Sequence, residues 1–314
     1  MQSKSTALTY AKLILTALFW GGTFIAGRSV AGSVNPFTAA FLRFCIATTL
    51  LLLLTRRAEG FFPSLDLRQV ISVTLLGSTG VFAYNAFFFK GLQDVEAGRA
   101  AVIIASNPIF ISLFSALIFG ERLGFKKIMG IVLSVAGAIV VITRGNPAAV
   151  LEGGFGRGEL YIFCCVFSWT AYTLIGKGVM RRLTPLVTVT YSSLIGTTLL
   201  IIPAYLEGMP DELALYGWPA WAGIAYLGVF GTVMGFLWFY EGVVHIGPVR
   251  ASQFINFVPV SAVVLAYLIL DEPVTISLLA GAALVVSGVY LAHLGSARGL
   301  ALSKGVPPEE AAGE

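Results

Sequence analysis

Residues 91–123 read GLQDVEAGRAAVIIASNPIFISLFSALIFGERL, and residues 242–274 read GVVHIGPVRASQFINFVPVSAVVLAYLILDEPV. The two stretches align without a gap at a spacing of 151 residues. The residues that coincide include Gly91 with Gly242, Arg99 with Arg250, Pro108 with Pro259 and Glu121 with Glu272. Glycines alone would coincide by chance in an apolar sequence, but arginine, proline and glutamate in one frame indicate an internal repeat.

The repeat extends over most of the chain. The frame of 151 residues runs from Gly77 to Gly137, and the earlier part of the chain aligns at 149 residues, where Trp20 corresponds to Trp169 and Pro36 to Pro185. We therefore expect a first repeat over residues 1–145, a second over residues 158–295 and a polar tail over residues 296–314.

The composition places both repeats in a membrane. Hydrophobic residues make up 57% of the 314 residues and charged residues only 11%, whereas ordinary soluble domains carry roughly 25% charged residues. A soluble enzyme is thereby excluded. The apolar runs are continuous and about 20 residues long, which is the length of a membrane-spanning helix and about twice that of a barrel strand.

The sequence therefore predicts an all-α integral membrane protein with ten spans, five in each repeat. The expected spans are Leu8–Gly27, Phe37–Thr55, Val70–Phe89, Ala97–Phe119, Ile128–Thr143, Leu160–Gly176, Leu186–Leu206, Trp218–Tyr240, Val249–Leu270 and Ile276–Leu294. Because five is odd, the second repeat enters the membrane upside down relative to the first. Inverted repeats of this kind are typical of secondary transporters, which expose a central site to each side in turn.

Basic residues predict the orientation. Most of the 20 Lys and Arg residues fall in the connections that share a side with the N-terminus. The opposite connections carry Arg28, Lys90, Arg99, Arg144 and Arg157. By the positive-inside rule, both termini are expected in the cytoplasm and the protein in the inner (plasma) membrane.

The sequence indicates no cofactor, no metal site and no nucleic-acid partner. Cys45, Cys164 and Cys165 all lie in apolar segments, and adjacent cysteines do not suggest a disulfide or a metal site. The expected partners are the lipid bilayer and a small-molecule substrate, and the sequence leaves the oligomeric state open.

Taken in order, several motifs give the chain a family likeness. They are Phe19-Trp20-Gly21-Gly22-Thr23-Phe24, Asn35-Pro36 with Arg43-Phe44, Gly91 through Pro108 to Glu121-Arg122, and Gly242 through Pro259 to Asp271-Glu272-Pro273. With these motifs the sequence resembles the ten-helix EamA branch of the drug/metabolite transporter superfamily. The resemblance covers about residues 8–294 and implies export of metabolites. Its aromatic residues look most like those of the aromatic amino-acid exporters.

Aromatic residues at corresponding places of the two repeats are the first candidates for a substrate site. Trp20 shares a helical face with Thr16, Thr23 and Gly27, since these residues recur at three- and four-residue intervals. We expect a central cavity walled by aromatic rings. The candidates are Trp20, Tyr84, Trp169, Tyr172 and Trp238. The alternative for the tryptophans is a packing role beside small residues.

Neutral polar residues are the second group of candidates. Asn85, Gln253 and Asn256 lie inside apolar segments, where each must find a hydrogen-bond partner on another helix or on a substrate. Amide groups would suit the carboxylate and ammonium of a zwitterion. Pro108 and Pro259, expected in mid-helix, would remove a backbone hydrogen bond and act as hinges.

The charged residues have other expected roles. Every Asp and Glu lies at or beyond the end of a predicted span, so tight proton coupling is not expected. Glu121 and Glu272 end two corresponding spans and should pair with a cation or cap a neighbouring helix. The family resemblance implies that the mid-span Arg43 is structural or gating, held by backbone carbonyl groups.

These residues predict a secondary transporter that works by alternating access and transports downhill or with weak coupling. The predicted substrates are small metabolites without net charge, above all amino acids, including aromatic ones. Other metabolite or drug exporters of the same fold are the first alternative, and a channel is the second. An enzyme is not expected, because no span carries a catalytic constellation.

Overall fold

The computed structural model describes residues 2–119, 124–146, 156–180, 182–246, 251 and 254–303. Within these ranges the secondary structure is helical, with no strand. Eight helical segments are long and apolar enough to cross a membrane, and Phe254–Leu270 and Ile276–Ala292 are shorter apolar helices. The predicted all-α fold with ten apolar spans is confirmed.

The chain forms two compact units, Met1–Ala101 with Gly156–Pro273 and Val102–Phe155 with Val274–Glu314. Unit 1 holds α1 (Gln2–Ala31), α2 (Pro36–Glu59), α3 (Leu67–Leu76), η1 (Gly77–Ala83), α4 (Tyr84–Asp94), the first part of α5 (Ala97–Ile104), α8 (Arg157–Val179), α9 (Pro185–Leu206), α10 (Met209–Glu212), α11 (Trp218–Tyr226), η3 (Leu227–Met234), α12 (Gly235–Ile246), η4 (Phe254–Asn256) and α14 (Phe257–Leu270). Unit 2 holds the end of α5, α6 (Asn107–Phe119), α7 (Phe125–Ile142) and α15 (Ile276–Ser303). Each unit contains segments from both sequence repeats.

In unit 1, α2 packs along α9. The hydroxyl oxygens of Thr48 and Thr197 are 2.9 Å apart and hydrogen-bonded. These two residues are 149 positions apart, which is the spacing of the first sequence alignment. Nearby, a Cβ atom built on Gly77 would lie 2.8 Å from the carbonyl oxygen of Ser192. Small residues therefore let the helix backbones approach closely here, as is common in membrane helix bundles.

Two spans of unit 1 contain a π-helical segment, η1 between α3 and α4 and η3 between α11 and α12. Gly77 in η1 corresponds to Gly228 in η3 at the spacing of 151 residues, so the two segments occupy matching places. Because a π turn shifts the register, Gly77 packs on Ser192 of α9 while Gly91 packs on Ile162 of α8.

The expected mid-helix prolines also need correction. Between α5 and α6 the helix is interrupted at Ala105 and Ser106, and Pro108 is the second residue of α6. Pro259 is the third residue of α14 and follows the short 3₁₀ turn η4. In the first turn of a helix, the missing proline N–H has no helical acceptor to lose. The prolines therefore begin helices here and do not remove bonds from their middles.

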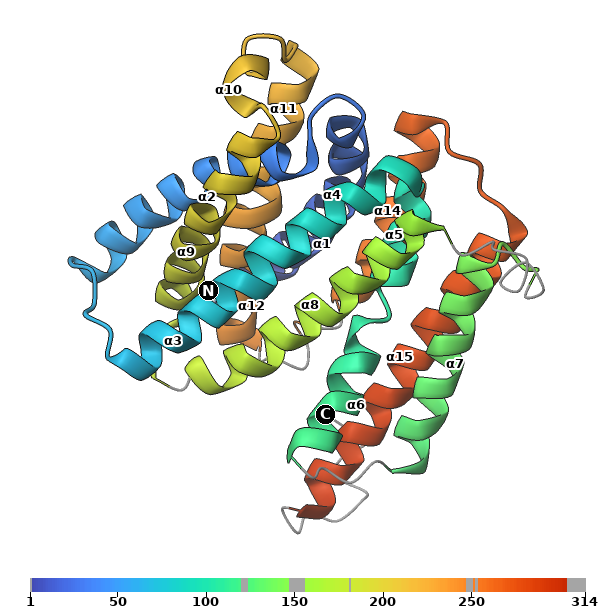
Figure 1. The fold of residues 1–314 in the computed structure, drawn as a ribbon. Helices are drawn as coiled ribbons and strands as arrows, with labels where there is room; N and C mark the ends of the chain where they lie inside the picture. The colour runs from blue at the N-terminus through green and yellow to red at the C-terminus, as the bar shows by residue number, and fades with distance from the viewer. Residues whose placement is uncertain are drawn as a thin grey trace. The chain divides into compact units, whose positions relative to one another are not determined.

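In unit 2, α7 and α15 lie side by side along their lengths (Figure 1). A Cβ atom on Gly130 would lie 2.5 Å from the Gly288 carbonyl oxygen, and one on Gly137 would lie 2.7 Å from that of Gly281. The reversed order of the partners means that the two helices run antiparallel.

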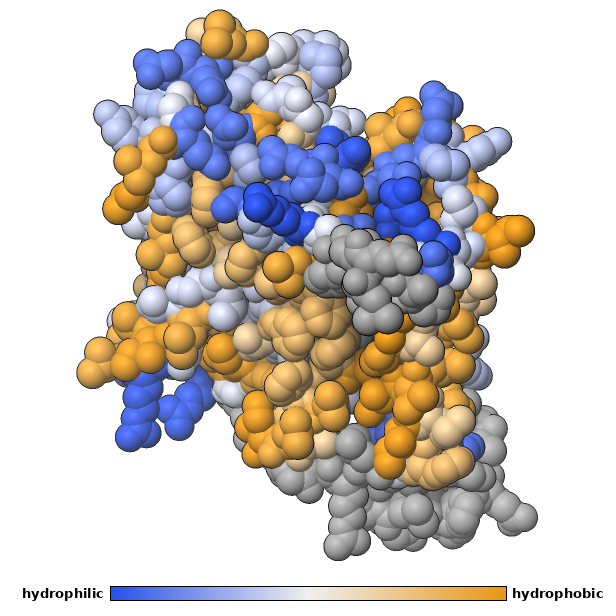
Figure 2. Space-filling model, turned by 45° about the vertical axis from the view of Figure 1, so that its right-hand side comes forward, coloured by the Kyte–Doolittle hydropathy of each residue, from blue (hydrophilic) through white to orange (hydrophobic). Residues whose placement is uncertain are grey.

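Large apolar side chains lie on the molecular surface, and Figure 2 shows broad hydrophobic areas on the face it presents. Ile202, Leu206 and Ile276 are 70%, 78% and 87% exposed. Exposed apolar surface on this scale would be a liability in water. It suits helices whose outer faces contact lipid.

The glycine contacts between α7 and α15 generate the first prediction. Gly137→Ala should lower the free energy of unfolding by about 1–3 kcal/mol, because the added methyl group meets backbone atoms that have no room to move. The measurement is the thermal midpoint of the purified protein in detergent. Gly178→Ala in α8 is the matched control, since its added methyl group would meet nothing within 4 Å. A midpoint for Gly137→Ala equal to that of the control would contradict this packing.

Candidate functional site

A buried arginine lies within α2. Arg43 is 8% exposed. Its Nη1 donates to Asn85 Oδ1 at 3.0 Å, and its Nε and Nη2 donate to Thr232 Oγ1 at 3.3 and 3.1 Å. The backbone carbonyl groups suggested as partners by the sequence analysis are thus not the acceptors; side-chain oxygens of α4 and η3 are. The guanidinium therefore joins α2 to one span from each repeat.

Both acceptors of Arg43 are bonded in turn to a π-helical segment. Asn85 Nδ2 donates to the Val81 carbonyl oxygen at 2.8 Å, and Thr232 Oγ1 donates to the Leu227 carbonyl oxygen at 3.0 Å. A π turn leaves carbonyl groups without their usual helical donors, and these side chains supply donors to them. The side-chain oxygen and nitrogen of Asn85 are therefore both engaged within the protein.

Four of the predicted aromatic residues come together beside this arginine. The ring centroids of Trp169 lie 5.5 Å from Tyr84, 5.2 Å from Tyr172 and 6.3 Å from Phe236, and Trp20 lies 5.8 Å from Phe236. We call these five residues the central aromatic cluster. Phe236 connects the tryptophans of the two repeats.

The sequence analysis did not single out Phe236 and placed Trp238 in the site. Phe236 corresponds to the candidate Asn85 at the spacing of 151 residues. Applying the repeat to Asn85 would therefore have added Phe236 to the candidate site residues. Trp238 instead has ring contacts with Phe19 at 5.5 Å and with the ammonium of Lys12 at 5.9 Å. Both of these contacts lie outside the central aromatic cluster.

Glycines bring the cluster against the backbone of the π-helical segments. Trp20 Nε1 donates to the Gly231 carbonyl oxygen at 3.0 Å. A Cβ atom on Gly231 would lie 2.5 Å from Thr23 Cγ2 and 3.8 Å from Arg43 Nη2. Gly231 therefore lies between the indole of Trp20 and the guanidinium of Arg43, where a side chain would clash.

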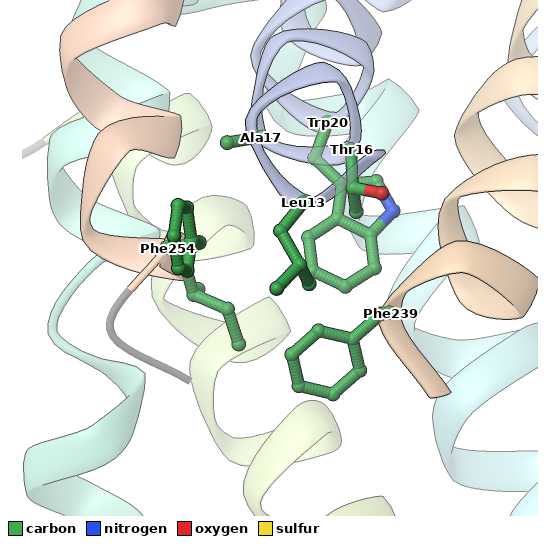
Figure 3. Close-up of a pocket in the computed structure, with 7 residues that line it drawn as sticks. Leu13, Thr16, Ala17, Trp20, Phe239 and Phe254 are labelled. Carbon is green, nitrogen blue, oxygen red and sulfur yellow. The ribbon is translucent and has the colours of Figure 1, made fainter. Parts of the chain in front are cut away.

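A crevice borders Trp20 between α1, α12 and η4. Figure 3 shows the side chains of Leu13, Trp20, Phe239 and Phe254 around it. Ala17 and Phe254 also line a neighbouring apolar groove of about 360 Å³ between α1 and α14. The crevice is lined by apolar side chains apart from Thr16, and it is too narrow to hold a water molecule.

The predicted polar pair in the second repeat is described only in part. Asn256 ends η4 and is half-buried. Gln253 lies outside the described residues, as does Glu121.

Glu272 caps a helix. Its Oε1 accepts from the backbone N–H of Ala97 at 2.7 Å, and its Oε2 accepts from that of Gly98 at 3.0 Å. These are the first two residues of α5, and a carboxylate there satisfies amide groups that have no helical acceptor. Of the two roles expected from the sequence, a cation partner or a helix cap, the structure has the helix cap.

Glu207 has a similar position at the start of α2. Its Oε2 accepts from the backbone N–H groups of Phe37 at 2.8 Å and Thr38 at 3.0 Å. Burial raises the pKa of Glu207, and the two amide hydrogen bonds only partly oppose the increase. Since folding raises this pKa, stability from the group is largest below the unfolded-state pKa and is lost as pH rises through the folded-state value.

Two ion pairs link helices in the described part of unit 1. Lys12 Nζ is 2.5 Å from Glu241 Oε2, and Arg99 Nη2 is 3.1 Å from Glu159 Oε1. Arg99 and Glu159 are both largely buried. Replacing only one of them would leave the other charge buried without its partner, which would destabilise the fold. Neither pair involves Arg43.

Apolar helical spans around a buried arginine and an aromatic cluster define a multi-pass membrane protein of the transporter class, and comparison with known proteins agrees. The family model "EamA-like transporter family" matches residues 7–143 and 156–294. The chain therefore belongs to the EamA-like transporter family.

Relatives and a solved structure resemble the chain over nearly its whole length. The uncharacterized transporter YyaM of Bacillus subtilis is 30% identical over 283 residues, with 90% of this chain and 92% of that protein covered. A probable terminal-alkyne amino-acid exporter of Streptantibioticus cattleyicolor is 28% identical, with 89% and 91% covered. A crystal structure with 22% identity matches at a TM-score of 0.61 over 94% of this chain and 98% of that one, and shows the same fold.

The contacts of Arg43 generate the second prediction. Thr232→Val keeps the shape of the side chain but leaves Nε and Nη2 of Arg43 without their acceptor. A buried donor left without a partner costs about 1–3 kcal/mol, so the thermal midpoint in detergent should fall. Thr198→Val is the control, because Thr198 is exposed and bonds only within its own helix. Equal midpoints for the two variants would remove Thr232 from the support of Arg43.

Proposed function

We propose that the protein is a secondary transporter that exports small metabolites without net charge, above all amino acids, including aromatic ones, by alternating access. The observation that carries this proposal is the central aromatic cluster, in which Trp20 and Trp169 from the two repeats meet through Phe236. Aromatic rings bind apolar and aromatic side chains. The name of the relative from Streptantibioticus cattleyicolor, a probable amino-acid exporter, supports the same substrate class.

Alternating access rests on two inverted repeats, residues 1–145 and 158–295, followed by the tail 296–314. Symmetric contacts support this division. Thr48 bonds Thr197, its counterpart at 149 residues, and Ser134 Oγ donates to the carbonyl oxygen of Val285, its counterpart at 151. A residue that bonds its own counterpart is expected where equivalent segments of the two repeats meet, and each unit contains one such contact.

The site residues follow from this arrangement. Trp20, Tyr84, Trp169 and Tyr172 form the walls, with Phe236 added and Trp238 toward the rim. Gln253 and Asn256 offer neutral hydrogen-bond partners, and the helix starts at Pro108 and Pro259 serve as hinges. Glu272 and Glu121 act as structural or gating residues at the ends of corresponding spans.

The environment and the energy source complete the proposal. Both termini face the cytoplasm, as the distribution of Lys and Arg favours, and the bilayer is the inner (plasma) membrane. The carboxylates of the sequence lie at or beyond span ends, which supports transport that is downhill or weakly coupled to protons.

The third prediction tests the function itself. Purified protein in liposomes loaded with an unlabelled amino acid should accumulate the labelled amino acid transiently, with saturation, at equal pH on both sides. Counterflow of this kind requires a carrier that exchanges one substrate for another. Stimulation by drugs but by no amino acid would favour a drug exporter, and flux without saturation would favour a channel. Either result would contradict the proposal.

The fourth prediction concerns substrate size. Trp169→Ala removes ring contacts with Tyr84, Tyr172 and Phe236, so counterflow of phenylalanine or tryptophan should fall at least about tenfold, equivalent to about 1.4 kcal/mol. Counterflow of alanine or serine should change much less, because these substrates do not fill the wall. Trp218→Ala is the matched control, since Trp218 is 78% exposed. Equal losses for large and small substrates would instead indicate a packing role for Trp169.

A further inference from the structure

The charge of Arg43 has no counter-charge among the residues that the structure describes. Its three hydrogen bonds go to a neutral amide and a neutral hydroxyl, and the ion pairs of this part of the chain involve Lys12 and Arg99. An arginine in the apolar interior of a membrane protein is costly, and such residues are commonly functional and paired. The positive charge of Arg43 is therefore not balanced by an acidic group among the described residues.

The guanidinium also has hydrogen-bond donors that make no bond within the described part of the protein. It has five N–H groups in a planar fork, and three of them make the hydrogen bonds to Asn85 and Thr232. The remaining two, one on each Nη, have no acceptor within the described residues. A carboxylate is the group that fits this fork, because its two oxygens accept two parallel N–H bonds and supply the missing negative charge.

The position of Arg43 connects this charge to the central aromatic cluster. Its Nη2 lies 3.8 Å from where a Cβ atom of Gly231 would be, and the carbonyl oxygen of Gly231 accepts from Trp20 Nε1. Its partner Asn85 directly follows Tyr84, whose ring contacts Trp169. A molecule with a carboxylate at one end and an apolar or aromatic side chain at the other matches both features.

We propose that Arg43 is the receptor for the carboxylate of the transported substrate. The inference rests on the proposed function, since it assigns one end of an amino-acid substrate to this residue. When the site opens, the substrate carboxylate accepts from the two free N–H groups, one on each Nη. Asn85 and Thr232 hold the guanidinium in place between transport cycles, and their neutrality leaves the charge available to the substrate.

The test uses Asn85→Asp, which places a permanent carboxylate where Arg43 Nη1 now donates. The new ion pair keeps the arginine bound, whereas loss of the Nδ2 donor to the Val81 carbonyl oxygen lowers stability, so the thermal midpoint in detergent is measured only to show that the variant folds. Inhibition of counterflow is measured with an amino-acid substrate, its carboxamide and its decarboxylated amine. Wild-type protein should prefer the amino acid over the carboxamide at least tenfold, and Asn85→Asp should reduce this preference to within about twofold. Asn146→Asp, which adds the same charge at an exposed position, should keep the wild-type preference.

The outcomes separate this inference from the proposed function. An Asn85→Asp protein that keeps the tenfold preference would overturn the role of Arg43. Wild-type protein that exchanges amino acids and their carboxamides equally well would also overturn it, without any variant, while the proposed function would stand. If Asn85→Asp does not fold, this wild-type comparison still decides. Absence of amino-acid counterflow in wild-type protein would refute the proposed function and the inference with it.

Discussion

The burial of one guanidinium charge in an apolar helical bundle is the constraint on which the rest of unit 1 depends. Arg43 needs acceptors, and it finds them on α4 and η3, which belong to different repeats. Asn85 follows η1 and Thr232 lies within η3, and both side chains also donate to carbonyl groups of these π-helical segments. A polar network in a low-dielectric interior is valuable only when its members are bonded, and this one fixes α2, α4 and η3 together.

Close backbone contact is the second constraint. The walls of the candidate site approach the π-helical segments at Gly80 and Gly231, where a Cβ atom would lie 2.2 Å from the Tyr172 ring and 2.5 Å from Thr23. Tyr172 and Thr23 are counterparts at 149 residues, as Gly80 and Gly231 are at 151. The two repeats thus use the same contact with different side chains. A small threonine methyl group on one side and a phenol ring on the other give equivalent backbone positions different side-chain neighbours.

Much of this architecture could be predicted from the sequence. Hydrophobic composition and run length predicted the all-helical membrane fold. In lipid, the backbone of a long apolar segment must satisfy its own hydrogen bonds, and a helix does so. The ordered motifs gave the family. Four of the aromatic candidates meet because Trp20 and Trp169 occupy equivalent positions. The π-helical segments could not be predicted, since no residue type marks a shift of hydrogen-bond register. Nor could it predict that Asn85 bonds Arg43, because that contact joins helices 42 residues apart.

Transport by exchange of two conformations requires that the repeats lie in the membrane with opposite orientation, and a labelling measurement tests this most directly. Ser64, after α2, and Leu215, after α9, are exposed residues in corresponding connections of the two repeats. Each is replaced by cysteine in a protein whose Cys45, Cys164 and Cys165 are changed to serine. In intact cells, an impermeant maleimide should label the cysteine at position 215, and it should label the one at position 64 only after the membrane is opened. Labelling of both from the same side would contradict inverted repeats and the alternating-access account built on them.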